Sequence, residues 1–520
     1  MPETPADKAP TLDKADRTAA SPALDPQRWK ALAFIAIAQL MVVLDATVVN
    51  IALPHAQADL HISDSNRQWV ITAYSLAFGG LLLFGGRVAD LWGRKRAFII
   101  GLVGFALASA LGGAAVNTGM LLGARALQGV FGALLAPAAL SLLAVTFTEA
   151  KERATAFGIF GAIAGAGGAV GLLLGGVLTQ YVNWRWSLYV NIVFAIVAVL
   201  GAVAFIHERE DQRNRNKLDI PGVLLATSGL VALVYGFTKA EEDGWGSGVT
   251  IGLFVASAVL LAAFVFVESK VKAPLLPLRV VANRNRGGVY LGLGLAVIGM
   301  FGLFLFLTYY LQWVKGYSPV MTGVAFLPMV VGMITGSTQI GARLMNRLPA
   351  RLLMGPGLFV AAIGMLLLTQ MKVDSSYWTL ILPAELLLGL GMGTSFMPAM
   401  SLATYKVQPQ DAGVASAMIN TSQQVGGSIG TALLNTIAAS ATTTWIAAHV
   451  ASPAAADKVL FAKEAAVHGY SVAIWWAVGI MVAASLIVAV FVNAGSHDAA
   501  AAAAAEGEGA EDVAIPVIAH

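Results

Sequence analysis

The sequence predicts an all-α membrane protein of about fourteen membrane-spanning helices, arranged as two six-helix bundles with two inserted helices between them. Of the 520 residues, 58% are hydrophobic and only 12% are charged, whereas a water-soluble domain has about 25% charged residues. The apolar residues form runs long enough to cross a hydrocarbon core of about 30 Å, separated by short polar stretches. Two pairs of related segments also recur at nearly equal spacing.

Fourteen apolar segments are predicted as transmembrane helices, and polar tails flank them. The first segment is too long for the core of a signal peptide and has no A-x-A cleavage site, so it is predicted to be retained. Residues 1–28 and 495–520 are predicted as disordered tails, because they are rich in polar residues or consist of an alanine run followed by acidic residues. The predicted helices are 31–54, 68–89, 97–116, 119–147, 152–180, 185–206, 219–238, 249–268, 286–312, 319–343, 351–371, 375–401, 411–439 and 469–493.

The basic residues orient this set of helices. With a cytoplasmic N-terminus, most of the 32 Lys and Arg residues fall in cytoplasmic loops, so the positive-inside rule predicts that both termini are cytoplasmic. The net charge of +3 is too small and too scattered to suggest nucleic-acid binding. The chain has no Cys, which excludes disulfides, thiolate catalysis and Cys-ligated metals.

An internal repeat predicts the two-bundle arrangement. The segment 85–90 is similar to 341–346, which lies 256 residues later, and the segment 167–171 is similar to 426–430, which lies 259 residues later. Two matches at nearly equal offsets predict two related halves with an insertion between them. The predicted parts are an N-terminal bundle (29–208), two accessory helices (209–270) and a C-terminal bundle (271–494).

Three charged residues lie well inside predicted membrane helices, away from the helix ends. A carboxylate there costs about 2.5–3.5 kcal/mol on insertion scales, so it must be protonated, paired or close to water. Asp45 is therefore the first candidate for proton coupling, with contact to a cationic substrate as a second role and a permanently paired structural Asp as the alternative. Arg125, with Gln128 one turn away on the same face, needs an anion, carbonyl groups or water. Glu385 either has a buried partner or lines a cavity, and is a candidate second coupling or cation-recognising carboxylate.

The loop after the second predicted helix has the pattern of a charge latch. Gly86 and Gly93 permit close backbone approach and a tight turn. Asp90 can pair with Arg94 and can face the N-terminal dipole of a neighbouring helix. Such a latch would hold the cytoplasmic side shut and break when that side opens. The alternative is that the basic cluster only fixes topology.

The fifth predicted helix carries a stripe of glycines at helical spacing, which lets another helix pack closely. Close packing alone would suit any transporter. The stripe and the adjoining glycine are Gly158, Gly161, Gly165, Gly168, Gly171 and Gly175.

Together these segments resemble the major facilitator superfamily, and specifically its fourteen-helix drug:proton antiporter branch, over residues 31–493. Residues 44–54 (LDATVVNIALP) are similar to the LDxTIVNVALP signature of the branch, and residues 86–96 resemble the cytoplasmic signature GxxxDxxGRKx. Residues 122–133 are similar to the RxxQGxGxA pattern, which implies that Arg125 assists proton transfer. Residues 171–176 (GLLLGG) resemble the antiporter element GPxxGG, but Leu172 stands where the family usually has Pro and keeps a backbone N–H.

The resemblance implies a proton-coupled secondary transporter that exports drugs, antibiotics or amphipathic metabolites across the cell membrane by alternating access. Its partners would be a small-molecule substrate, protons and the lipid bilayer. It would work as a monomer, with the proton gradient as energy source and no bound cofactor or metal. The alternatives are a facilitator or importer, which Leu172 leaves open, and a non-transporting sensor or enzyme. The absence of phosphate-binding-loop, H-E-x-x-H and G-x-S-x-G motifs disfavours an enzyme.

Overall fold

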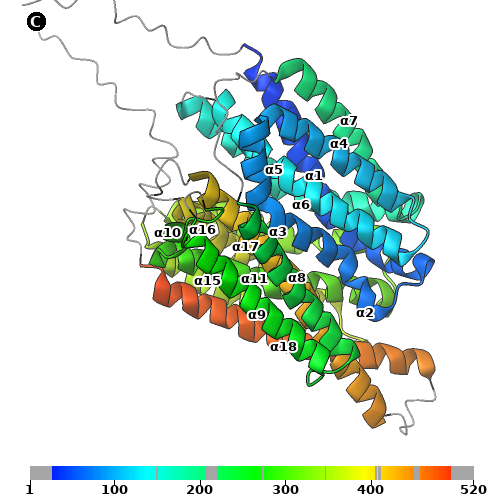
Figure 1. The fold of residues 1–520 in the computed structure, drawn as a ribbon. Helices are drawn as coiled ribbons and strands as arrows, with labels where there is room; N and C mark the ends of the chain where they lie inside the picture. Colours follow the sequence, from blue (N-terminus) through cyan, green and yellow to red (C-terminus); the bar gives the residue numbers. More distant parts are fainter. Residues whose placement is uncertain are drawn as a thin grey trace, which may run out of the picture.

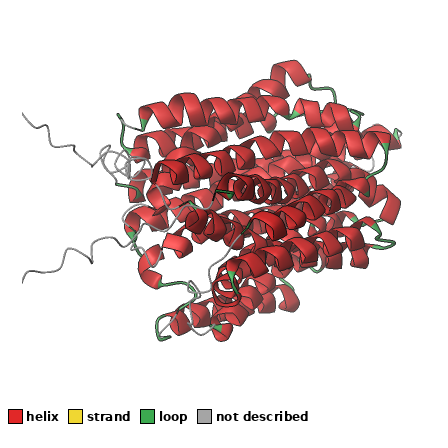
Figure 2. Ribbon diagram, turned by 90° about the horizontal axis from the view of Figure 1, so that it is seen from above, coloured by secondary structure: helices red, strands yellow, loops and turns green. Residues whose placement is uncertain are grey.

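The computed structural model contains only helices as regular elements among the residues that it describes (Figure 2). The predicted tails lie almost entirely outside these residues, and so do the segments 207–218 and 450–456. The described residues are 26–147, 150–206, 219–271, 274–345, 347–404, 407, 412–449 and 457–493.

Twelve helical stretches in the described residues are long and apolar enough to cross a membrane. Two further helices, α6 and α17, are 32 and 38 residues long and lie among them. The long helices are α1 (Arg28–Leu60), α3 (Trp69–Trp92), α4 (Arg94–Gly113), α5 (Thr118–Thr146), α6 (Ala150–Tyr181), α7 (Trp186–Phe205), α8 (Ile220–Glu242), α9 (Gly248–Glu268), α11 (Arg284–Tyr309), α15 (Ala350–Leu368), α16 (Leu382–Thr404), α17 (Ala412–His449) and α18 (Lys458–Phe491).

The predicted helix 319–343 is divided into short elements in the structure. The segment from Pro319 to Leu344 consists of α12 (Pro319–Ala325), α13 (Leu327–Thr335), a π-helical turn (Gly336–Gly341) and α14 (Ala342–Leu344). The remaining short elements are α2 (Asp64–Arg67), α10 (Leu278–Val281) and the π-helical turns Tyr310–Val314 and Tyr377–Ile381.

The helices pack as two related bundles, and an accessory pair lies along one side of them (Figure 1). In the first bundle α1 packs on α6 and α7, and α5 packs on α3 and α4. In the second bundle α11 packs in the same way on α17 and α18, and α16 packs on α13 and α15. The hairpin of α8 and α9 contacts α3 and α17 through α8.

Glycines produce the same close approach in both halves, which supports the predicted repeat. A Cβ at Gly171 or Gly175 of α6 would collide with α1, at Thr47 and Val48 respectively. In the second half, a Cβ at Gly426 or Gly430 of α17 would collide with the backbone of α11. Because glycine has no Cβ, the first helix of each half can lie directly against the fifth.

The helices α17 and α18 extend further than the sequence predicted. The predicted end at 439 and the predicted start at 469 were wrong: α17 continues to His449 and α18 already begins at Lys458. Hydropathy reports only the apolar part of a helix. The additional turns are more polar, and in them Trp445 of α17 packs on Phe461 of α18, with the ring centres 5.1 Å apart.

Candidate functional site

Asp45 and Arg125 form a buried ion pair inside the first bundle. Nη1 of Arg125, from α5, lies 2.6 Å from Oδ2 of Asp45, from α1. Their side chains are 1% and 0% exposed. A buried pair of this kind is favourable only when further hydrogen bonds satisfy the remaining polar atoms.

Two amide side chains and a hydroxyl supply those hydrogen bonds. Oδ1 of Asp45 accepts from Gln128 at 2.8 Å and from Asn191 of α7 at 2.7 Å. Both amides also donate to Oγ of Ser109 on α4, at 2.7 and 3.3 Å. We call Asp45, Arg125, Gln128, Asn191 and Ser109 the polar cluster; it joins four helices, and all five side chains are buried.

Nη1 of Arg125 also donates to Oε1 of Gln128 at 2.7 Å, and α3 provides two further contacts. Nε of Arg125 donates to the carbonyl oxygen of Val70 at 2.9 Å, and the guanidinium group lies 4.5 Å from the centre of the Tyr74 ring. A cavity of about 10 Å³, close to the volume that one water molecule needs, borders Arg125 on the side of Val49 and Leu121.

The contacts of Arg125 in this cluster depend on the charge of Asp45. In the closed cluster the carboxylate is matched by one positive charge and accepts three hydrogen bonds. Protonation would remove the charge that holds Arg125, and the guanidinium would then have to find other partners or water. The hydroxyl of Tyr74 and Oδ1 of Asn191 are both buried and lack a hydrogen-bond partner among the described residues, so they are available to take part in such a rearrangement.

Sequence reasoning identified part of this cluster. Asp45 and Arg125 were recognised as charges in apolar segments, and the structure brings them together. The contribution of Ser109 was missed, because a serine in a transmembrane helix is unremarkable. Asn191 could have been found as a strongly polar amide in an apolar helix.

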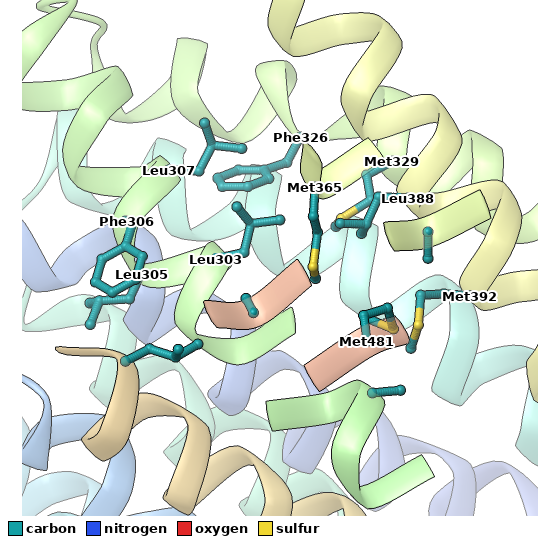
Figure 3. Close-up of a cluster of buried hydrophobic side chains, with 14 of the residues drawn as sticks. Leu303, Leu305, Phe306, Leu307, Phe326, Met329, Met365, Leu388, Met392 and Met481 are labelled. Carbon is teal, nitrogen blue, oxygen red and sulfur yellow. The ribbon is translucent and has the colours of Figure 1, made fainter. Parts of the chain in front are cut away.

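Glu385 lies in the second bundle, apart from the polar cluster. It is 1% exposed, and neither carboxylate oxygen has a hydrogen-bond partner among the described residues. Leu388, one turn further along α16, belongs with Met329 and Met365 to a buried apolar cluster (Figure 3). The sequence predicted that Glu385 either has a buried partner or lines a cavity. The described residues include no hydrogen-bond partner for its carboxyl group.

The expected cytoplasmic latch is described in part. Gly93 joins α3 to α4 with φ of +99°, a conformation that favours glycine. The close approach expected at Gly86 falls instead at Gly85, where a Cβ would overlap the carbonyl oxygen of Ala133 on α5; a Cβ at Gly86 would make only an ordinary contact. Arg94 begins α4, while the side chain of Asp90 lies outside the described residues.

The second half of the glycine stripe of α6 faces α1. Gly171 and Gly175 lie against α1, but a Cβ at Gly168 would meet nothing within 4 Å. The surroundings of Gly161 and Gly165 lie outside what the structure describes. Leu172, buried in the same turn, meets the other bundle instead: its carbonyl oxygen lies where a Cβ on Gly323 of α12 would point.

Hydrogen bonds join the two bundles at one end of the molecule. Gln57 accepts from the hydroxyl of Tyr309, and the backbone N–H of Val320 donates to Gln180 at 3.2 Å. Arg67, which is 9% exposed, donates to Asn435 of α17 at 3.3 Å. We call this end, where α1 finishes, the Gln57 end.

Two helical bundles of related packing, with a buried charge pair in one and, in the other, a buried carboxyl group that has no hydrogen-bond partner among the described residues, are typical of a membrane transporter. The chain belongs to the major facilitator superfamily, whose family model matches residues 35–431. It is a multi-pass membrane protein of a family that moves small molecules across membranes.

Relatives cover most of the chain. The chain is 54% identical to the puromycin resistance protein of Streptomyces alboniger over 471 residues, which are 90% of this chain and 92% of that one. It is 38% identical to the cephamycin export protein of Amycolatopsis lactamdurans, over 79% of this chain and 85% of the relative. It is 33% identical to the tetracenomycin C resistance and export protein of Streptomyces glaucescens, over 83% and 80% of the two chains.

A solved structure has the same fold. The crystal structure of a bacterial homologue of the human lysosomal transporter Spinster, in an inward-facing and unoccupied conformation, matches with a TM-score of 0.63. The match covers 92% of this chain and 99% of that one, at 17% identity. At this identity the likeness concerns the fold alone.

Proposed function

We propose that this protein exports antibiotics or other amphipathic metabolites from the cell in exchange for protons. Relatives named for resistance to puromycin and for export of cephamycin and tetracenomycin C support the direction and the class of substrate. The resemblance of residues 44–54 and 122–133 to signatures of the drug:proton branch supports the coupling. Puromycin is the first compound to test, because the relative named for it is 54% identical.

The observation that carries the proposal is the buried pair of Asp45 and Arg125. A proton that reaches Asp45 neutralises the carboxylate, and the interaction that ties α1 to α5 weakens. Since α1 also packs on α6, and α6 contacts α12 of the other bundle, a change at Asp45 reaches the junction between the bundles. Proton binding and the movement of the bundles would thus be coupled.

The remaining parts of the proposal follow the transport cycle. Both termini face the cytoplasm, which places the Gln57 end outside the cell and the segment of Gly93 and Arg94 inside. The proton gradient drives export, and the protein needs no bound cofactor, catalyses no chemical reaction and works as a monomer. Asp90 and Arg94 form the cytoplasmic latch.

Glu385 is the second functional carboxyl in this proposal. Its burial without a hydrogen-bond partner among the described residues favours the neutral, protonated form, because an unpaired buried charge is costly. Opening of the second bundle to water would let it ionise, either to carry a second proton or to bind a cationic substrate.

Everted membrane vesicles with an acidified lumen test the coupling. Puromycin addition is expected to release protons from the lumen with the native protein, and to give no response with Asp45→Asn, because the amide cannot exchange a proton. Leaving Arg125 without a counter-charge can cost about 3–5 kcal/mol of stability, so the amount of folded protein is measured alongside. Asp374→Asn, at an exposed turn, serves as the control and should respond normally.

The same assay separates the alternatives. An unchanged proton response with Asp45→Asn would contradict the coupling role of this residue. Substrate movement that is the same with and without a proton gradient would indicate a facilitator instead of an antiporter.

A further inference from the structure

The accessory helices contain two buried carboxyl groups that face each other. Asp219 precedes α8 and Glu268 ends α9, so the hairpin brings the two residues together. A Cβ on Gly222 would lie 2.6 Å from Oδ2 of Asp219 and 2.6 Å from Oε1 of Glu268. The two oxygens are therefore no more than twice that distance apart, and the two carboxyl groups are close enough to interact directly.

One oxygen of each carboxyl group is already engaged. Oδ1 of Asp219 accepts from the backbone N–H of Gly222 at 2.9 Å, as the N-cap of α8. Oε2 of Glu268 accepts from the backbone N–H of Leu276 at 2.9 Å. These bonds fix both side chains, so the facing oxygens cannot turn away without losing a backbone hydrogen bond.

The facing oxygens have no donor. Oδ2 of Asp219 and Oε1 of Glu268 are buried and lack a hydrogen-bond partner among the described residues, and the two residues are 7% and 4% exposed. Neither Asp219 nor Glu268 forms an ion pair with another described residue. Arg87 of α3 approaches the segment after α9, but it donates to the carbonyl oxygen of Pro274 at 3.1 Å.

Two ionised carboxylates in this position would repel each other and could not form a hydrogen bond, since neither can donate. One proton resolves both problems, because a protonated carboxyl donates to the ionised one and the charge of the pair falls from −2 to −1. We propose that Asp219 and Glu268 form a proton-binding site, separate from Asp45, that holds one proton between Oδ2 and Oε1.

The site ties together segments that the hairpin alone would not connect. The proton joins the start of α8 to the end of α9. Glu268 also accepts from the backbone N–H of Leu276, and two residues earlier the carbonyl oxygen of Pro274 accepts from Arg87 of α3. Loss of the proton would load this connection with two negative charges. The proton therefore stabilises the attachment of the accessory hairpin to the helix that leads to Gly93.

The test is the pH dependence of thermal stability in the purified full-length protein, for the native chain, Asp219→Asn and Glu268→Gln. The unfolded chain carries ionised, ordinary carboxyls, so a proton held only in the folded state adds stability that is lost as pH rises. From mildly acidic to mildly alkaline pH, the native melting temperature should fall more steeply than that of either variant, by the equivalent of one bound proton. Asp243→Asn, at the opposite end of α8, should keep the native slope.

Each amide variant keeps a carbonyl oxygen for the backbone N–H that the carboxylate served, and its NH₂ group can donate to the remaining carboxylate. Each variant thus imitates the protonated pair, and if one fails to fold the other carries the test. Infrared difference spectra should show a protonated carboxyl band in the native protein that both variants lack. Native and variant slopes that coincide would overturn the proposal, as would a native stability that depends on the concentration of Na⁺ and not on pH, which would indicate a metal cation in place of the proton.

Discussion

At the scale of single residues, the charges inside apolar helices were the most informative feature of the sequence. The cost of placing Asp45, Arg125 and Glu385 in a membrane predicts that each has a special environment. The sequence does not reveal which of them meet. Which charges meet depends on how each helix is rotated about its axis and on which helices are its neighbours. In the structure Asp45 and Arg125 lie in one cluster, and Glu385 lies in the other bundle.

Substitution of Glu385 by Gln separates a structural role from a functional one. Gln is neutral and similar in shape, so a carboxyl that stays protonated is replaced with little change, and the melting temperature should stay close to the native value. If Glu385 must ionise during transport, puromycin efflux should fall at least about tenfold, which corresponds to about 1.4 kcal/mol. Glu242→Gln, at a residue that pairs with Lys239 on the surface, is the control. Native efflux by Glu385→Gln would show that ionisation is not needed.

At the scale of the helix, the sequence predicted where apolar segments lie but not how the helices meet. The predicted 119–147 agrees closely with α5 (Thr118–Thr146), because an apolar run and the capping residue Asn117 mark the same start. Close approaches were harder to place, since neighbouring glycines are equivalent in the sequence. The pair of Gly85 and Gly86 shows this, because only the structure identifies Gly85 as the residue against α5.

A Gly→Ala pair tests this contact between α3 and α5. At Gly85 a Cβ would overlap the carbonyl oxygen of Ala133, which belongs to the backbone and cannot rotate away, so Gly85→Ala forces the helices apart. Overpacking of this kind typically costs about 1–3 kcal/mol, and the melting temperature should fall. Gly123→Ala is the matched control, since a Cβ there meets nothing within 4 Å and alanine favours the helix by up to about 1 kcal/mol. Equal melting temperatures for the two variants would mean that α3 and α5 do not pack as described.

At the scale of the whole molecule, the repeat predicted two related halves but not the state in which they lie. The offsets between segments fix which helices correspond, and the packing of α1 on α6 and of α11 on α17 agrees with them. The conformation depends on contacts between side chains of different halves. Several hydrogen bonds between described residues of the two bundles lie at the Gln57 end, whereas at the other end Arg87 donates to Pro274, in the segment that follows α9. The Gln57 end is therefore closed.

A cross-link at this closed end should stop transport if the bundles must part there during the cycle. The chain has no Cys, so a Gln180→Cys, Val320→Cys variant reacts with a short thiol cross-linker without background. It joins α6 to α12, where Gln180 already meets the backbone of Val320. Puromycin transport into everted vesicles should fall to a few per cent of the uncross-linked rate, and reduction of a cleavable cross-linker should restore it.

The matched control places the same reagent inside one bundle. Asp59 and Arg185 lie 2.9 Å apart, both within the first bundle, so a cross-linked Asp59→Cys, Arg185→Cys variant restrains no movement between the halves and should keep transporting. Inhibition in both variants would indicate an effect of the reagent or of local distortion. Continued transport by the cross-linked Gln180→Cys, Val320→Cys variant would mean that α6 and α12 stay together throughout the cycle. In that case the bundles would pivot about the Gln57 end, and the substrate would have to leave by another route.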